Sequence, residues 1–465
     1  MRKNRDLDRL FDPSSLAIVG ASKDDSRGGG RFLKRLINDG FKGLLYPINP
    51  RESELMGLKN YRSVLDIPGE IDLAILTIPA KASPQVIAEC SQKGVKFAVV
   101  HSVGFSELGI EGKALEEEMV NCARQGITRI IGPNCMGIYS PSAHINTIAL
   151  LPVSKDAAFE TGSVGFAGQS GWVTENVIQM GHEQGLRFSK VVSIGNQCDL
   201  TIEDLLEYFG NDHKTKVIAF YVEGFKRGRE FFQLAKQISK KKPIIVWKGG
   251  RSEVGVRAAS SHTGALAGND VVADAALLQS GAVIVENLEE LLDLIVGFTC
   301  PILPQGNRIG LLVGTGGGGV TSADTAEALG LKIPMLPAET QGKLVGILQD
   351  KVPPFSTPVN PVDHVWSPAG DAVELLQGCS RIMLPEVDAL VMITYSVFDE
   401  HFIKAFTKVI DETGKPIFIV PGHPAERQEG MTLLIQNGIP TFTIPERAIK
   451  VLAAMVGYSN YRQQS

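Results

Sequence analysis

One histidine of the chain stands in a stretch of small residues whose composition suits a chemical role. His262 is surrounded by hydroxyls, alanines and glycines over residues 257–268, as is typical of a mobile loop rather than of a packed helix or strand. A neutral imidazole can attack phosphorus near pH 7 and release it again. We therefore expect His262 to act as a nucleophile or phosphate carrier; the alternative is an ordinary histidine on a surface loop.

A carboxylate that could serve this histidine follows the apolar run 217–222. Glu223 ends a predicted strand, at the same sheet edge as the turn around Ser170. A carboxylate there can accept the imidazole N–H, fix its tautomer and make it more nucleophilic. The alternative is a strand-end carboxylate in a surface ion pair with Lys226 or Arg227.

Two glycine-bearing turns, at 166–172 and 313–320, each lead from a predicted strand into a predicted helix. Such turns present unpaired backbone N–H groups and the positive end of a helix dipole, so both are candidate phosphate cradles. Together they could hold a phosphohistidine from two sides. The alternative for each turn is close packing of helix on strand.

Other nucleotide motifs are weaker. The turn at 20–30 carries Lys23 and Arg27 among small residues, which suits a phosphate that needs both backbone donors and positive charge. It lacks the order of a Walker A loop. Residues 314–319 match G-x-G-x-x-G, but no carboxylate stands at 331–337 to hold a ribose, so a nicotinamide or flavin cofactor is not predicted.

Composition narrows the class of protein. The 465 residues predict about three domains, and a formal net charge of −5 gives no basic surface for nucleic acid. No apolar run is long enough to span a membrane, and the charged amino terminus does not resemble a signal peptide, so we expect a cytoplasmic protein. The scattered cysteines and histidines predict neither disulfides nor a metal site.

Short runs rich in Ile, Val and Leu alternate with longer amphipathic stretches, a pattern that predicts an α/β fold with parallel strands. Residues 300–307 carry two prolines and a glycine and are interpreted as a linker. We expect strands at 16–20, 43–48, 73–78, 97–101, 162–168, 217–223, 243–247, 308–314, 389–394 and 416–420.

Eight motifs, in this order and spacing, resemble those of nucleoside-diphosphate-forming acyl-CoA synthetases, relatives of succinyl-CoA synthetase. The resemblance runs from about residue 8 to 460. The motifs lie at 20–22, 46–50, 77–80, 132–137, 168–171, 193–196, 221–224 and 261–268.

The resemblance implies a CoA-binding Rossmann-like domain at 1–145, a flavodoxin-like ligase domain carrying the phosphohistidine loop at 150–298, and a second flavodoxin-like ligase domain at 305–465. The family's ATP-grasp module is not recognised in the sequence, so we expect an α subunit with an ATP-grasp β subunit, as α2β2. The implied ligands are CoA, phosphate, a small carboxylic acid or its acyl-CoA, and ADP or ATP with Mg on the partner.

The resemblance also assigns residues. His262 becomes the phosphohistidine and Glu223 the carboxylate that orients it. The implied phosphate-binding residues are Gln169, Ser170, Gly171, Gly317, Gly318, Asn134 and Cys135. The implied CoA-binding residues are Gly20, Ala21, Ser22, Lys23, Arg27, Asn49, Pro79, Ser102, Val103 and Gly104.

The implied activity is reversible: an acyl-CoA and phosphate give an acyl phosphate and CoA, and the phosphoryl group then passes to His262 and to ADP. Two departures from the family pattern are Trp172, where a small residue is usual, and a third-domain turn that has glycines but no proline. One alternative is a CoA-binding regulatory or acyltransfer subunit without ligase activity. Another is a Rossmann protein that senses nucleotides.

Overall fold

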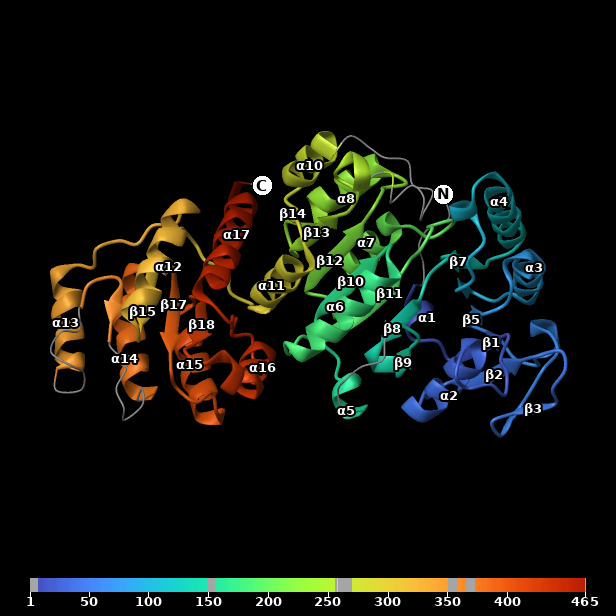
Figure 1. Cartoon of the computed structure of the whole chain (residues 1–465), viewed down its shortest axis with the longest axis horizontal. Helices are drawn as coiled ribbons and strands as arrows, with labels where there is room; N and C mark the ends of the chain where they lie inside the picture. Colours follow the sequence, from blue (N-terminus) through green and yellow to red (C-terminus); the bar gives the residue numbers. More distant parts are fainter. Residues whose placement is uncertain are drawn as a thin grey trace. The chain divides into compact units, whose positions relative to one another are not determined.

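The computed structural model describes residues 7–148, 155–255, 257, 270–349, 358–364 and 373–464. The chain divides into two compact units, one of residues 1–182 and 187–288 and one of residues 183–186 and 289–465. Figure 1 shows the elements of both units in chain order. Within the described ranges, no helix is both long and apolar enough to cross a membrane.

The first unit begins with a five-stranded parallel sheet in the order β2-β1-β5-β6-β7. Its central strands are buried at every residue and apolar apart from Ser15, as expected for strands covered on both faces. The strands are β1 Ser15–Val19, β2 Leu44–Ile48, β5 Leu73–Leu76, β6 Phe97–Val100 and β7 Arg129–Ile131, with the small hairpin β3 Glu54–Leu55 and β4 Leu58–Lys59. The helices are α1 Asp8–Phe11, α2 Gly28–Asp39, α3 Ser83–Lys93 and α4 Ile110–Arg124.

A seven-stranded sheet follows in the same unit, in the order β14-β13-β12-β10-β11-β8-β9. Strands β10 to β14 are parallel, whereas β8 and β9 add an antiparallel edge. The strands are β8 Gly137–Ser140, β9 Ile145–Asn146, β10 Val164–Gly168, β11 Phe188–Ser193, β12 Val217–Val222, β13 Ile244–Lys248 and β14 Val283–Val285. The helices are α5 Lys155–Ala158, α6 Gly171–Glu183, α7 Ile202–Asn211, α8 Gly228–Ile238 and α10 Asp270–Gln279.

The second unit contains a four-stranded parallel sheet in the order β16-β15-β17-β18. Its strands are β15 Ile309–Val313, β16 Val362–Asp363, β17 Ala389–Thr394 and β18 Ile417–Pro421. Its helices are α11 Leu288–Thr299, α12 Gly316–Ala328, α13 Ala338–Leu348, α14 Val373–Met383, α15 Glu400–Thr413, α16 Gln428–Gln436 and α17 Pro445–Gln464.

The three parallel sheets confirm the predicted α/β class, and each of the ten expected strands matches an observed one to within about two residues. Strand β8 and the first residue of β9, Ile145, fall within the range 1–145 expected for the CoA-binding domain, yet both strands pair into the second sheet. One buried cluster, including Phe11, Leu16, Phe209 and Phe220, extends from the first sheet to the second. The division into three domains remains a prediction.

Candidate functional site

The carboxyl edge of the first sheet carries the residues predicted to bind CoA. Gly20 follows β1, Asn49 follows β2, and the segments with Pro79 and Ser102 follow β5 and β6. The Asn49 side-chain amide donates to the Ala21 carbonyl at 2.7 Å, and the Gly20 N–H donates to the Ile48 carbonyl. These loops therefore lie together where parallel sheets bind ligands.

Glycine is required at the first turn. Gly20 has φ +89°, and a Cβ there would lie 2.9 Å from the Thr77 carbonyl oxygen. A Cβ on Gly29 in α2 would lie 2.5 Å from the Gly20 carbonyl oxygen. The turn thus brings its backbone close to β5 and to the start of α2, which leaves its N–H groups near the start of that helix.

The two cations predicted for a phosphate both make ion pairs. Lys23 Nζ lies 2.7 Å from Glu52, and Arg27 Nε lies 2.8 Å from Asp24. The side chains of Lys23 and Arg27 are 73% and 86% exposed. Exposed ion pairs are weak, so an arriving phosphate could replace either carboxylate.

The loop after β6 is held from one side by a carboxylate. Glu107 accepts hydrogen bonds from the N–H groups of Gly104, at 2.6 Å, and Phe105, at 3.1 Å. Ser102 Oγ donates to the Ile78 carbonyl, so its hydroxyl also holds the loop. Val103 is 66% exposed. Of the three predicted residues here, only Val103 exposes a large apolar side chain, whereas Ser102 and Gly104 shape the backbone of the loop.

At the carboxyl edge of the second sheet, Gln169 and Glu223 come together. Gln169 is 5% exposed, and its side-chain oxygen accepts the N–H groups of Glu223 and Gly224. Tyr221 donates its hydroxyl to Glu223 Oε1 at 3.3 Å. Glu223 Oε2 is buried, and no described residue donates a hydrogen bond to it. A buried carboxylate oxygen without a donor is costly, which points to a partner that completes the site.

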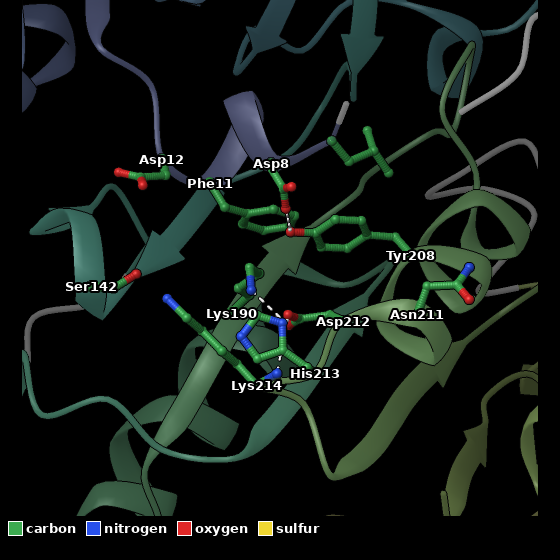
Figure 2. Close-up of a pocket in the computed structure, with 11 residues that line it drawn as sticks. Asp8, Phe11, Asp12, Ser142, Lys190, Tyr208, Asn211, Asp212, His213 and Lys214 are labelled. Atoms are coloured by element: carbon green, nitrogen blue, oxygen red, sulfur yellow. Dashed lines mark hydrogen bonds and ion pairs between the residues drawn. The ribbon is translucent and has the colours of Figure 1, made fainter. Parts of the chain in front are cut away.

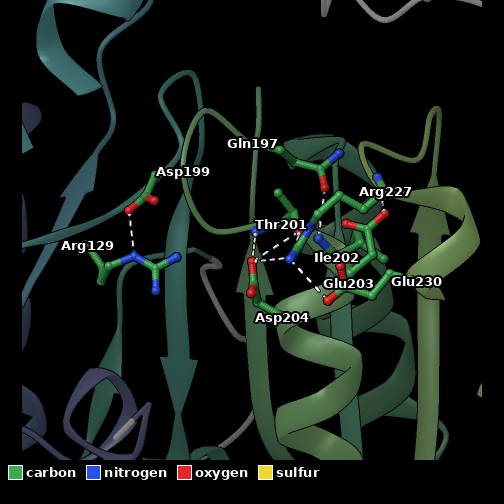
Figure 3. Close-up of polar contacts among 9 residues, drawn as sticks. All are labelled: Arg129, Gln197, Asp199, Thr201, Ile202, Glu203, Asp204, Arg227 and Glu230. Carbon is green, nitrogen blue, oxygen red and sulfur yellow. Dashed lines mark hydrogen bonds and ion pairs between the residues drawn. The ribbon is translucent and has the colours of Figure 1, made fainter. Parts of the chain in front are cut away.

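The predicted alternative for Glu223 is an ion pair with Lys226 or Arg227, and neither pair occurs among the described residues. Arg227 instead lies 2.8 Å from Asp204 and 3.1 Å from Glu230 (Figure 3). Its backbone N–H donates to Glu203. The segment after β12 is thus fixed to α7, and Glu223 is not involved in that network.

Helix α6 starts at this edge, directly after Ser170. Ser170 Oγ accepts a long hydrogen bond of 3.4 Å from the Val173 N–H. A Cβ on Gly171 would lie 2.7 Å from Met136 Sδ, so the helix start approaches the loop before β8. Trp172 is 65% exposed, so its ring is largely accessible to solvent rather than packed against the described part of the chain.

The loop at 132–136 carries Asn134 and Cys135. The Cys135 thiol is 7% exposed and donates to the Val100 carbonyl at 3.3 Å, and burial raises its pKa to about 12. This side chain therefore offers nothing to a phosphate, and only its backbone could take the predicted role. Asn134 has φ +55° and donates its side-chain amide to Asn196 Oδ1 at 3.3 Å.

The predicted cradle of the second unit starts helix α12. Thr315 Oγ1 accepts the Gly318 N–H at 3.4 Å, so one predicted phosphate donor already has a partner. Apart from its own helix turn, no atom of the described residues lies within 4 Å of a Cβ built on Gly317, so a side chain would have room there. His262 and its loop lie outside the described residues, so the geometry between His262 and Glu223 is not described.

Sequence reasoning missed three polar residues that contact one another: the buried Asn196 and Glu116, and the half-buried Glu107. Asn196 is 2% exposed, and its amide nitrogen lies 2.6 Å from Glu107 and 3.0 Å from Glu116. The motif at 193–196 indicated that this turn matters, but only the fold brings it next to residues nearly ninety positions earlier.

A cavity of about 450 Å³ lies at the opposite, amino edge of the second sheet. Figure 2 shows the buried Lys190 of β11 beside Asp212, at 2.6 Å, below the rings of Phe11 and Tyr208. These rings stack with centroids 5.2 Å apart. None of the predicted site residues lines this cavity.

Comparison with known proteins agrees with this arrangement. A model described as a CoA binding domain matches residues 14–141, and one described as a succinyl-CoA ligase like flavodoxin domain matches residues 161–298. The alpha subunit of acetate–CoA ligase (ADP-forming) II from Pyrococcus furiosus is 39% identical over 463 residues, 97% of each chain. The chain belongs to the family of ADP-forming acyl-CoA synthetase alpha subunits.

Two further relatives show the range of this family. A structure of dinucleotide-forming acetyl-coenzyme A synthetase 1 from Ca. Korarchaeum cryptofilum, in complex with phosphate and ADP, superposes with a TM-score of 0.86 at 36% identity and 98% coverage of both chains. A 4-hydroxybutyrate–CoA ligase (ADP-forming) from Nitrosopumilus maritimus is 32% identical over 98% of this chain and 65% of its own length.

Proposed function

We propose that this chain, with a partner subunit, interconverts an acyl-CoA, phosphate and ADP with a carboxylic acid, CoA and ATP. The observation that carries the proposal is the buried Glu223 Oε2, which has no hydrogen-bond donor among the described residues, at the edge where α6 begins. This oxygen is suited to accept the N–H of an imidazole, and the α6 start to hold a phosphoryl group. Membership of the ADP-forming ligase family supports the same chemistry.

The proposed reaction has three balanced steps. Phosphate attacks the thioester carbonyl, which gives an acyl phosphate and releases CoA. His262 then takes the phosphoryl group from the acyl phosphate, which leaves as the carboxylate. Transfer from His262 to ADP yields ATP and restores the histidine. Glu223 accepts the second ring N–H throughout, so the attacking nitrogen keeps its lone pair.

CoA is proposed to bind at the carboxyl edge of the first sheet. The residues proposed to contact it are those of the turn from Gly20 to Lys23, together with Asn49, Pro79 and Val103. An ATP-grasp β subunit is proposed to hold ADP or ATP with Mg, in an α2β2 assembly in the cytoplasm. The printed name of the Pyrococcus furiosus relative, an alpha subunit matched over 97% of both chains, supports a partner subunit.

The acyl group is proposed to be small, acetate-like or larger. Trp172 stands 65% exposed on the first turn of α6, next to Gln169 and Ser170. An indole there would limit the length of the acyl chain. Replacing it, Trp172→Ala, should raise kcat/KM for butyryl-CoA relative to acetyl-CoA, and an unchanged ratio would remove Trp172 from the acyl site.

The direct test is intact-mass measurement of the full chain with its ATP-grasp partner, phosphate and a panel of acyl-CoA thioesters. Wild type and His213→Ala, an exposed control, should gain one acid-labile phosphoryl group, and His262→Ala should gain none. Yields would rank the acyl groups. No adduct with any thioester would refute the proposed activity.

A further inference from the structure

Asn196 makes contacts on both sides of a boundary between the two sheets of the first unit. It lies in the turn after β11 and is 2% exposed. Its amide nitrogen donates to Glu107 Oε2 at 2.6 Å and to Glu116 Oε2 at 3.0 Å, and its oxygen accepts from Asn134. One side chain therefore contacts groups from three separate segments.

The amide is chemically suited to this place. Its two hydrogens can each serve one carboxylate, and two carboxylates so close together would otherwise repel each other. Burial alone raises the pKa of Glu107, but hydrogen bonds from Asn196 and from the Gly104 N–H outweigh it, and the net pKa is lowered. Glu107 thus stays charged, which strengthens its hydrogen bonds.

The first segment is the loop after β6. Glu107 uses its other oxygen to hold the N–H groups of Gly104 and Phe105. Ser106 Oγ donates to Glu116 at 2.8 Å. Because Asn196 orients both carboxylates, the conformation of this loop depends on an amide from the second sheet.

The second segment is the loop at 132–136. The Asn196 N–H donates to the Pro133 carbonyl at 3.0 Å. Gly195 has φ +57°, and a Cβ there would lie 2.1 Å from the same carbonyl oxygen. The loop and the turn are packed backbone to backbone, so neither can shift without the other.

We propose that Asn196 is a positioning residue that ties the loop at 102–105, on the CoA side, to the loop at 132–136, on the phosphate side, through Glu107 and Glu116. This inference rests on the proposed function, because it assigns CoA to the loop after β6. Asn196 sets the distance between bound CoA and phosphate without contacting either.

The test is calorimetric titration of the full chain with CoA. Asn196→Asp places a third carboxylate between Glu107 and Glu116, and it should weaken CoA binding by about tenfold or more. The double variant Asn196→Asp with Glu107→Gln restores one donor–acceptor pair, so it should bind CoA more tightly than Asn196→Asp alone. The control Asn211→Asp, at the far end of α7, should bind like wild type.

The titrations distinguish failure of the positioning role from failure of the proposed function. Wild-type affinity in Asn196→Asp, or no recovery in the double variant, would overturn the positioning role and leave the proposed function intact. If wild type itself binds no CoA, the proposed function fails and this inference with it. If Asn196→Asp does not fold, Glu107→Gln alone decides, because it places two donors face to face; unchanged CoA affinity in that variant would overturn the inference.

Discussion

The two edges of the seven-stranded sheet differ in the hydrogen bonds that their carboxylates accept. At the amino edge, Asp212 accepts hydrogen bonds from Lys190 at 2.6 Å and Thr215 at 2.8 Å. At the carboxyl edge, the buried Glu223 Oε2 receives none from any described residue. The same sheet thus carries a satisfied ion pair at one end and, at the other, one carboxylate oxygen that has no donor in the described part of the chain. The first arrangement serves stability, and the second is available for catalysis.

The largest expected effect is on catalysis at the carboxyl edge. Glu223→Gln replaces the acceptor of the imidazole N–H by a group that can present a donor, so kcat should fall by at least about a hundredfold. Its unfolding free energy should change by less than about 1 kcal/mol, because no described donor is lost from Oε2. Steady-state ATP formation and urea unfolding check both parts. Glu230→Gln, on the exposed Arg227 pair, is the control and should retain wild-type kcat.

At the amino edge we expect a substitution to lower the stability of the chain and to leave its catalytic rate unchanged. Asp212→Asn leaves the buried Lys190 ammonium without its counter-charge, so the unfolding free energy should drop by about 3 kcal/mol. The value of kcat should stay that of the wild type. The control is Glu339→Gln, which breaks the exposed pair with Lys343 and should leave the unfolding free energy close to that of the wild type. Equal losses in both variants would mean that burial of the Lys190 pair contributes nothing.

A pH dependence is expected from His182, which lies near the carboxyl end of α6. Burial, with a contribution from Arg187, lowers its pKa to about 4, and Tyr139 contacts its Nε2 at 2.9 Å. In the unfolded state His182 has an ordinary pKa near 6.5, so between about pH 6.5 and 4 it is protonated in the unfolded state and neutral in the folded state. Stability is therefore lost as pH falls from about 6.5 towards 4, by about 1 kcal/mol between pH 7.5 and 5.5. Urea unfolding at both pH values should show a smaller drop in His182→Asn; an identical drop would exclude His182 as the cause.

The smallest effect concerns a thiol beside the site. Burial raises the pKa of Cys135 to about 12, whereas the partly exposed Cys122 is raised less. Iodoacetamide at pH 8 should label Cys122 and leave Cys135 unmodified in the folded chain, because the thiolate is the reactive form. Peptide mass spectrometry reads this out, and labelling of Cys135 would show that the loop at 132–136 opens.

The sequence predicted the strands that are apolar throughout, because burial on both faces leaves an uninterrupted run such as that of β17. It missed β11, where Ser189 and Lys190 interrupt the run. Both are buried because Thr215 and Asp212, more than twenty residues away, satisfy them. A compensation between segments distant in sequence cannot be read from local pattern.

For the candidate site, too, the sequence predicts positions along the chain but not contacts between distant segments. The strand-end position of Glu223 follows from the run before it, and the glycines of the turn at 20–30 signal a close approach. The partners of Lys23 and the burial of the Cys135 thiol depend on side-chain directions that spacing does not reveal. Asn196 could be noticed as part of a motif, but its two carboxylates come from the turn after β6 and from helix α4, eighty or more residues earlier in the chain.

The measurement that tests the central claim most directly is the phosphoryl content of Glu223→Gln beside Asp212→Asn, each with the ATP-grasp partner, phosphate and acetyl-CoA. We predict that Asp212→Asn, measured well below its unfolding temperature, forms the acid-labile adduct as wild type does, and that Glu223→Gln forms little or none although it is as stable as wild type. Full phosphorylation of Glu223→Gln would contradict the assignment of catalysis to the carboxyl edge.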